Sequence, residues 1–445
     1  MTEILAVDGG PPLRSRPWLD NFTTGDAERQ AVLAVLDSGY LSLFEGSHTP
    51  DPPFAFTGGP AVHRLEDLAA ERLGVPHVVS VNSATSGLYA AIGALGLGYG
   101  DEVIVSPYTM SACAAAPLVY GAIPVFADVE DGGSLSVAAV AARLTPRTRA
   151  ILVVHQFGIP ADMDGLLALA ADHQLKVIED CAQAWGARHR GRPVGTLGDI
   201  GVFSFNVNKT IQSGEGGLCV TRDADLAYRL QLIRNHGEAV VGPAGYDAIT
   251  NIIGYNYRMT ELTAAVACEQ MRRLEDLNRQ RLELVAQLSE GLARYDCFVP
   301  PAGRPDCDST YYVYPLRYLA GHLGQRPRAE LVKALNAEGI LFYQGYVRPL
   351  YLQPLYQRRQ AFRHGYPWSA PENRDSQPDY SPGSCPTAER LHNHEMIINE
   401  HIRPPQSSGD VTDILGAVDK VLGAWGQARS APPRDWSGPR SDEIG

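Results

Sequence analysis

Two patterns of apolar residues alternate along the first half of the chain, one of short runs and one of longer segments. The short runs are rich in Val, Ile and Phe and are bounded by Gly, Pro or polar residues, which is typical of buried strands. They lie at residues 77–81, 102–106, 123–127, 149–155, 176–180, 200–205 and 217–221. The longer segments predict helices at 88–95, 112–120, 137–144 and 163–173. This alternation predicts an α/β fold with a mostly parallel seven-stranded sheet and helices on both faces.

The remaining patterns place further elements on either side of this sheet. Helices are predicted at 26–38 and 62–73, a long helical region at 260–292, and a last helix at 411–425. After the prolines at 300–305 the pattern changes, with strands expected at 311–318 and 340–346, a helix at 328–337 and a loop at 365–384. We therefore expect a large domain over 15–295, a smaller α+β domain over 296–428 and a disordered tail over 429–445.

Composition narrows the classes of function. The formal net charge of −12 argues against duplex nucleic acid as a partner. No apolar run reaches the length of a membrane-spanning helix, and the N-terminus lacks a basic start followed by an apolar core. We therefore expect a cytoplasmic protein with no membrane partner. The seven cysteines show no metal-ligand spacing, so no metal site is predicted.

One lysine stands out in a chain where arginine fills most basic positions. The chain has four lysines, and Lys176, Lys333 and Lys420 fit solvated surface positions. Lys209 instead follows a predicted strand and precedes a glycine-rich turn, in FSFNVNKTIQSGEGG. Arginine cannot replace lysine as a nucleophilic amine, because the guanidinium stays protonated. Lys209 is thus either a nucleophile or an ordinary surface lysine of a loop.

Several residues at the ends of other predicted strands could assist such an amine. The segment NSATSG opens a helix and offers backbone N–H groups with the hydroxyls of Thr85 and Ser86, as a phosphate site requires. Ser204 adds a hydroxyl at a strand end, and the ring of Tyr108 could stack on a planar ligand. An ordinary helix cap and core packing are the alternatives for these residues.

Asp180 is a candidate functional carboxylate, because it ends a predicted strand and is followed three residues later by Gln183. Alone, this carboxylate could be a metal ligand, a general base or the partner of a cationic ring. No GxGxxG follows a strand and no GxxxxGK[ST] occurs, which disfavours nicotinamide and P-loop chemistry. Together, a lysine, a carboxylate, a phosphate cradle and an aromatic ring suit pyridoxal 5′-phosphate (PLP), whose ring nitrogen must stay protonated.

Ordered motifs extend this picture to nearly half of the chain. They are NSATSGLYAAIGALGLGYGDEVIVSPYT, PVFADVE, IEDCAQAWGARHRGRPVGTLGDIGVFSF, NK…GEGG, RNHG and GYNYRMTELTAA, over roughly residues 60–270. With them the sequence resembles the sugar aminotransferases of the DegT/DnrJ/EryC1/StrS family. That resemblance implies the fold type I architecture of PLP transferases and PLP as cofactor.

The resemblance also implies a role for each matching residue. Lys209 would hold PLP as a Schiff base and shuttle protons, and Asp180 would pair with the pyridine nitrogen. The other cofactor contacts would be Thr85, Ser86, Tyr108, Gln183, Ser204 and Asn256. Asn256 would reach the phosphate of the neighbouring subunit, which implies a homodimer with shared active sites. Trp185, Arg258 and Tyr346 are the candidate substrate contacts.

The activity implied is transfer of an amino group from L-glutamate or L-glutamine to a keto-sugar or keto-cyclitol. The segments RPLY and CPTAERL are most similar to cyclitol-type members, for which glutamine is a usual donor. Two features depart from the usual family pattern: the segment NVNKTIQ, which contains Lys209, and the residue Trp185. We expect both of them near the substrate mouth. The alternatives are a PLP lyase or dehydratase of the aminohydroxybenzoate-synthase type and a PLP-binding regulator without turnover. Relatives that become dehydratases replace the lysine by histidine, so Lys209 favours transamination.

Overall fold

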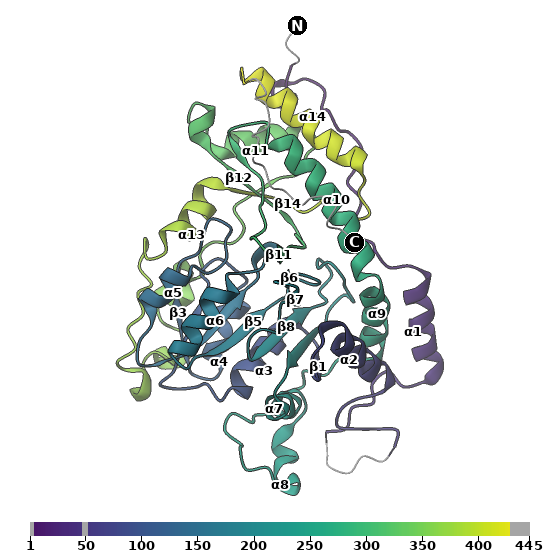
Figure 1. The fold of residues 1–445 in the computed structure, drawn as a ribbon, viewed down its shortest axis with the longest axis vertical. Coiled ribbons are helices and arrows are strands. Elements are labelled where there is room, and N and C mark those ends of the chain that lie inside the picture. Colours follow the sequence, from purple (N-terminus) through teal and green to yellow (C-terminus); the bar gives the residue numbers. More distant parts are fainter. Residues whose placement is uncertain (1–3, 47–51, 428–445) are drawn as a thin grey trace.

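A seven-stranded sheet forms the centre of the computed structural model, which describes residues 4–46 and 52–427 (Figure 1). The strand order is β1-β9-β8-β5-β4-β2-β3. β9 runs antiparallel to the other six strands of this sheet. All seven predicted strands are confirmed, at β1 (His77–Val81), β2 (Glu102–Val105), β3 (Ile123–Phe126), β4 (Thr148–Val154), β5 (Lys176–Asp180), β8 (Ile200–Ser204) and β9 (Gly217–Thr221).

Both faces of this sheet are buried under helices. Along β2, Val103 and Val105 pack in one core cluster, whereas Ile104 packs in another on the opposite face. This split follows from the period of two along a strand. The helices that cover the sheet are α2 (Pro60–Leu73), α3 (Ala84–Ala94), α4 (Ala112–Val119), α5 (Val137–Arg143), α6 (Met163–Asp172) and α7 (Ala224–Arg234).

Helices outside the sheet begin and end where local signals place them. The helix α1 (Asp26–Ser38) has the predicted bounds and ends at Gly39, whose φ of 76° suits glycine. The expected long helical region consists of α9 (Glu261–Arg272) and α10 (Leu274–Leu292), which are separated at Arg273.

A second, antiparallel sheet builds the smaller α+β part of the molecule. Its order is β10 (Phe298–Val299), β12 (Tyr314–Tyr318), β14 (Met396–Asn399) and β13 (Tyr343–Gln344). The helices α10, α11 (Arg328–Ala337) and α14 (Ser408–Ala424) pack with it. The predicted strands at 311–318 and 340–346 are shorter than expected, and β14 was not predicted. The last helix is confirmed, since α14 nearly coincides with 411–425.

Hydrophobic packing extends across residue 295, where the sequence predicts the boundary between the two domains. Leu284 and Leu288 of α10 lie in one core cluster with β12, so the end of this helix belongs to the smaller core. The segment 365–384 is largely irregular, as expected, but it is well packed: the Tyr380 hydroxyl donates to the carbonyl of Pro124 at 2.6 Å. The domain limits remain a prediction, and the tail over 429–445 lies outside the described residues.

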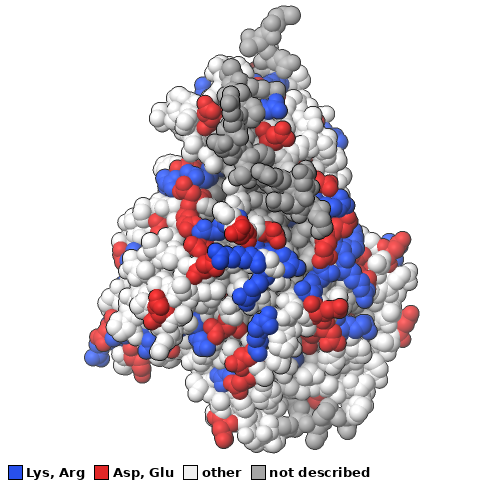
Figure 2. Space-filling view, viewed as in Figure 1, with Lys and Arg blue, Asp and Glu red and all other residues white. Residues whose placement is uncertain are grey.

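Short elements connect the larger ones. They include a three-stranded sheet of β11 (Cys307–Asp308), β6 (Arg188–His189) and β7 (Arg192–Pro193), and the helices α8 (Val241–Ala244), α12 (Pro354–Gln357) and α13 (Pro386–Arg390). A π-helical turn follows α13 at Leu391–Glu395. None of the helices in the described ranges is long and apolar enough to span a lipid bilayer. Acidic and basic side chains intermix on the face drawn in Figure 2.

Candidate active site

The carboxyl ends of β5 and β8 bring Asp180 and Lys209 to the same edge of the sheet. The two strands are parallel neighbours, β5 ends at Asp180, and Lys209 lies in the turn after β8. Lys209 is 8% exposed and Asp180 is 5% exposed. Burial lowers the pKa of the Lys209 amine, while the negative charge of Asp180 opposes that shift. A buried lysine with a lowered pKa is more often present as the nucleophilic free amine.

Two of the other lysines, Lys176 and Lys420, have an acidic partner, which Lys209 lacks among the described residues. Lys176 forms an exposed ion pair with Asp199. Lys420 was expected on the surface, but this was wrong, because its side chain is 7% exposed and its Nζ lies 2.8 Å from a carboxylate oxygen of Glu338. Burial of Lys420 is therefore compensated by a paired charge. Lys209 has no ion pair in the described part of the chain, and its Nζ lies 4.6 Å from the ring centroid of Tyr312.

Two donors hold the carboxylate of Asp180. The Sγ of Cys113 donates to Oδ2 at 3.1 Å, and the backbone N–H of Ala182 donates to Oδ1 at 2.9 Å. Burial and the nearby charge of Asp180 raise the pKa of the Cys113 thiol well above its usual value, so the thiol keeps its proton. Sequence reasoning missed Cys113, which lies in the first turn of α4 after the end of β2.

The helix α3 begins beside the end of β8, where the sequence predicts a phosphate cradle. Ser83 caps the helix by accepting the N–H of Ser86 at 3.1 Å, and the Ser86 hydroxyl donates to Oδ1 of Asn82 at 2.6 Å. A Cβ added to Gly217, which pairs with Ser204, would lie 2.7 Å from the backbone nitrogen of Ala84. The strand ends therefore approach the start of α3 closely.

Hydroxyl groups in this cradle differ in their availability. The Oγ of Ser204 accepts the N–H of Asn206 at 3.2 Å, which leaves its own proton free to donate. Thr85 is exposed at the start of α3. Ser86 is 4% exposed and its hydroxyl already serves the helix cap. Thr85 and Ser204 are thus better placed than Ser86 to meet a phosphate.

Aromatic rings and one amide line the other side of Asp180. The Oε1 of Gln183 accepts the N–H of Phe157 at 2.7 Å, and its Nε2 donates to the hydroxyl of Tyr346 at 3.1 Å. The ring of Tyr346 contacts that of Tyr108 edge-on, with centroids 5.8 Å apart. Burial raises the pKa of Tyr346 to about 12. The Tyr108 hydroxyl is buried and has no partner among the described residues.

In the structure, Trp185 lies in the hydrophobic core and not at the expected substrate mouth. Trp185 is 1% exposed, its ring lies 4.3 Å from that of Phe203, and its Nε1 donates to the carbonyl of Ser204 at 2.9 Å. The expectation of a substrate contact was therefore wrong, because the ring fills the core behind β8. Trp185 supports the backbone of Ser204 instead.

Arg258 and Asn256 lie in the segment that follows Tyr255. Arg258 donates to Oδ1 of Asn235 at 2.9 Å, so its guanidinium already has a partner within the chain. Asn256 forms a bridge with Asn235 through the backbone and is exposed. An exposed Asn256 agrees with a contact to a second subunit, which remains a proposal.

Comparison with known proteins identifies the family of the chain. The sequence profile of the DegT/DnrJ/EryC1/StrS aminotransferase family matches residues 54–418. The chain belongs to this family. It is therefore an enzyme, an aminotransferase, with the fold type I architecture.

The relatives and solved structures that match the aminotransferase cover 80% of the chain or more. The L-glutamine:2-deoxy-scyllo-inosose aminotransferase of Streptomyces fradiae is 34% identical over 95% of this chain and 98% of its own. The UDP-N-acetyl-3-dehydro-alpha-D-glucosamine 3-aminotransferase of Acidithiobacillus ferrooxidans is 39% identical over 80% of this chain and 88% of its own. The structure of S. venezuelae DesV in complex with a ketimine intermediate matches with a TM-score of 0.76 and 31% identity, covering 92% and 98% of the two chains.

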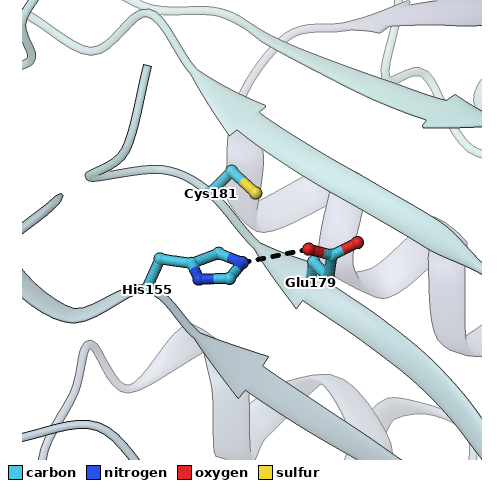
Figure 3. A group of neighbouring side chains, drawn as sticks. All are labelled: His155, Glu179 and Cys181. Carbon is cyan, nitrogen blue, oxygen red and sulfur yellow. Dashed lines mark hydrogen bonds and ion pairs between the residues drawn. The ribbon is translucent and has the colours of Figure 1, made fainter. Parts of the chain in front are cut away.

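A buried group of His155, Glu179 and Cys181 lies beside the candidate site of the aminotransferase (Figure 3). The Nδ1 of His155 accepts the N–H of Ala161 at 3.1 Å, so its Nε2 donates to Glu179 at 3.0 Å. The same carboxylate accepts the backbone N–H groups of residues 195, 197 and 198 at 2.7–2.8 Å. These bonds use the His155 and Glu179 atoms that a metal would need. The group is therefore better described as a structural hydrogen-bond network around Glu179.

The residues at the sheet edge fit PLP by their chemistry. A buried amine without an ion pair, a carboxylate 5% exposed and a helix start with hydroxyls match an aldehyde, a pyridine nitrogen and a phosphate. The unpartnered hydroxyl of Tyr108 and the free proton of Ser204 offer further donors. The family to which the chain belongs also implies PLP.

Proposed function

We propose that this aminotransferase uses PLP to move the amino group of L-glutamine to a keto-cyclitol or keto-sugar. The observation that carries the proposal is the buried, unpaired amine of Lys209 beside Asp180 at the carboxyl edge of the sheet. Open α/β sheets bind ligands at this edge. The start of α3 lies there as well, where a phosphate would be bound.

The residues of the chain then divide the work. When bound, PLP supplies an aldehyde that captures amines and a protonated ring that accepts electron density. Lys209 would hold the aldehyde group of the cofactor and would move a proton as a general acid and base. Asp180 holds a proton at the ring nitrogen. Thr85, Ser204 and the N–H groups of α3 hold the phosphate.

Aromatic residues complete the same pocket. Tyr108 would cover one face of the ring, and Gln183 would lie on its hydroxyl side, next to Tyr346, which would face the substrate. The hydrogen bond from Gln183 to Tyr346 supports this shared placement. Asn256 is exposed and would contact the phosphate held by a second copy, so we propose a homodimer with shared active sites.

The choice of substrate rests on relatives that span the chain. The S. fradiae enzyme is named for glutamine and 2-deoxy-scyllo-inosose, whereas the A. ferrooxidans enzyme is named for a nucleotide-linked sugar. The first covers 95% of this chain and the second 80%, so we favour glutamine and a keto-cyclitol.

The test begins with a PLP titration of the wild-type protein and of Lys209→Ala. We expect the wild type to gain the visible absorption of PLP bound to a lysine amine, and Lys209→Ala not to gain it. Glutamine labelled with ¹⁵N at its α-amine is then supplied with 2-deoxy-scyllo-inosose or the UDP-linked keto-sugar. Label found in the product supports transamination. Loss of water without label transfer would favour the lyase or dehydratase alternative.

A further inference from the structure

Cys307 differs from the other cysteines of the chain in its exposure and in its neighbours. The other six cysteines are buried, whereas Cys307 is partly exposed. It lies on β11, and His189 of β6 is its direct partner across the two antiparallel strands. The Sγ of Cys307 lies 3.2 Å from Nδ1 of His189, which is within hydrogen-bond distance. A thiol that small molecules can reach therefore faces an imidazole nitrogen.

The other ring nitrogen of His189 faces a carboxylate. Its Nε2 lies 3.1 Å from Oδ1 of Asp164, which belongs to the first turn of α6. The contact with His189 lowers the pKa of Asp164, so this carboxylate is ionised at neutral pH. An ionised carboxylate accepts hydrogen bonds and donates none, which places a proton on Nε2. Nδ1 is then able to accept the proton of the Cys307 thiol.

These three side chains lie in the order of a nucleophile, a base and a group that orients the base. A nucleophile that shares a hydrogen bond with a base can pass its proton to it, and a carboxylate stabilises the imidazolium that results. Burial raises the pKa of the Cys307 thiol, so the thiolate has to be formed by transfer of its proton to His189. His189 is 8% exposed, which shields this transfer from water. A fully solvated surface cysteine lacks both features.

We propose that Cys307, His189 and Asp164 form a site for exchange with low-molecular-weight disulfides. His189 takes the proton of the Cys307 thiol, and the thiolate attacks one sulfur of the disulfide. A bond forms between Sγ and that sulfur as the S–S bond of the reagent breaks. The second sulfur leaves as a thiolate and takes the proton from His189. Cys307 is thereby oxidised to a mixed disulfide, and half of the reagent is reduced to a thiol.

The chemistry of the cluster favours a small disulfide as the reagent. Cys307 is only partly exposed and has the buried ring of His189 beside it, so a small molecule reaches its sulfur more easily than a protein would. Exchange also releases a thiolate, and the protonated His189 can return the proton to it. None of the three residues belongs to the candidate active site, so the exchange site does not depend on the proposed amino transfer.

The experiment follows the reaction of the folded protein with dithiodipyridine, a neutral disulfide that releases one absorbing thione for each thiol modified. The wild type is expected to release one equivalent in a fast phase, since the other six cysteines are buried. Mass spectrometry should place the adduct on the peptide that contains Cys307. Cys307→Ser should lose the fast phase. Persistence of the fast phase in Cys307→Ser would overturn the proposal.

The rate of the fast phase then tests the two neighbours of the thiol. His189→Gln keeps a side chain of similar size without a base and should slow the phase at least about tenfold. Asp164→Asn should slow it about threefold or more, because the imidazole loses its charged partner. Asp172→Asn is the matched control, since Asp172 is exposed at the other end of α6 and should leave the rate unchanged.

A second control separates the two contacts of Asp164, which also forms an exposed ion pair with Arg190 at 2.8 Å. Arg190→Gln breaks that pair but leaves the carboxylate at His189, so the rate should stay within about twofold. Circular dichroism checks the folding of each variant. Asp164 is half exposed, so Asp164→Asn is expected to fold even if His189→Gln does not. An unchanged rate in Asp164→Asn would overturn the proposal, because Cys307 and His189 would then form only a structural contact between two strands.

Discussion

The thiol of Cys113 donates a hydrogen bond of 3.1 Å to Oδ2 of Asp180, and both side chains are buried. The second oxygen of Asp180 accepts the N–H of Ala182. The carboxylate is thus held in one orientation by two donors from different elements, α4 and the turn after β5. Cys113 is in this sense a positioning residue for Asp180.

Removing the thiol of Cys113 should slow turnover without preventing folding. We expect Cys113→Ala to lower kcat about threefold to tenfold, because one hydrogen bond to a buried carboxylate is lost. Cys113→Ser keeps a donor of similar size and should recover most of the rate. The measurement is steady-state kinetics, with PLP affinity determined in parallel. Equal rates in all three proteins would show that the thiol does not position Asp180.

Asp180 itself is expected to matter for turnover far more than for cofactor capture. Asp180→Ala should still take up PLP through Lys209 and the α3 cradle, because neither contact requires the carboxylate. Its turnover should fall by about 10³-fold or more, since the ring nitrogen loses its charged partner. Visible absorption reports the binding, and label transfer from glutamine reports the rate. Wild-type turnover in Asp180→Ala would remove this residue from its proposed role.

The local patterns predicted the strands of the large sheet because a buried parallel strand is marked by its own residues. They could not predict β14, whose short run MIIN lies inside an irregular stretch. Trp185 was misplaced for a related reason. Its neighbours Phe203 and Phe205 lie across a strand connection, and nothing adjacent in the sequence shows that contact.

The candidate site shows the same division between local and distant signals. Lys209 and Asp180 could be recognised because Asp180 ends a strand that the sequence marks clearly and Lys209 follows another. Cys113 comes from a segment that is far from Asp180 in the chain, and the two residues meet only after folding. The sequence pattern of an amphipathic helix also does not show which of its polar residues will be buried, as the ion pair of Lys420 with Glu338 shows.

The hydrogen-bond network around Glu179 predicts that the stability of the folded protein depends on pH. Burial would raise the pKa of Glu179, but the hydrogen bond from His155 and those from the backbone of Gly198 and Gly195 outweigh it and lower the pKa. A lowered pKa stabilises the folded state above the ordinary glutamate pKa of about 4.3, and this contribution is lost as the pH falls through the folded value.

Glu179→Gln should therefore lower the free energy of unfolding by about 3–5 kcal/mol at pH 7. The difference from the wild type should shrink below about pH 4.3, where the Glu179 carboxylate takes up a proton in the unfolded chain while the folded protein still keeps it ionised. Denaturant unfolding at several pH values measures both effects. The control is Glu283→Gln, which removes an exposed pair with Arg279 and should change stability by less than about 0.5 kcal/mol. A constant difference at all pH values would contradict this account.

Trp185 offers a test that separates a core role from a substrate role. Trp185→Ala should cost about 3–5 kcal/mol of stability, because a large buried ring is removed beside Phe203 and Phe205. Trp185→Phe keeps much of the packing and loses only the hydrogen bond to the carbonyl of Ser204, so it should cost about 1–2 kcal/mol. Because the ring is buried behind β8, KM for the keto substrate should stay within about twofold in Trp185→Phe. A large increase in KM with stability unchanged would return Trp185 to the substrate site.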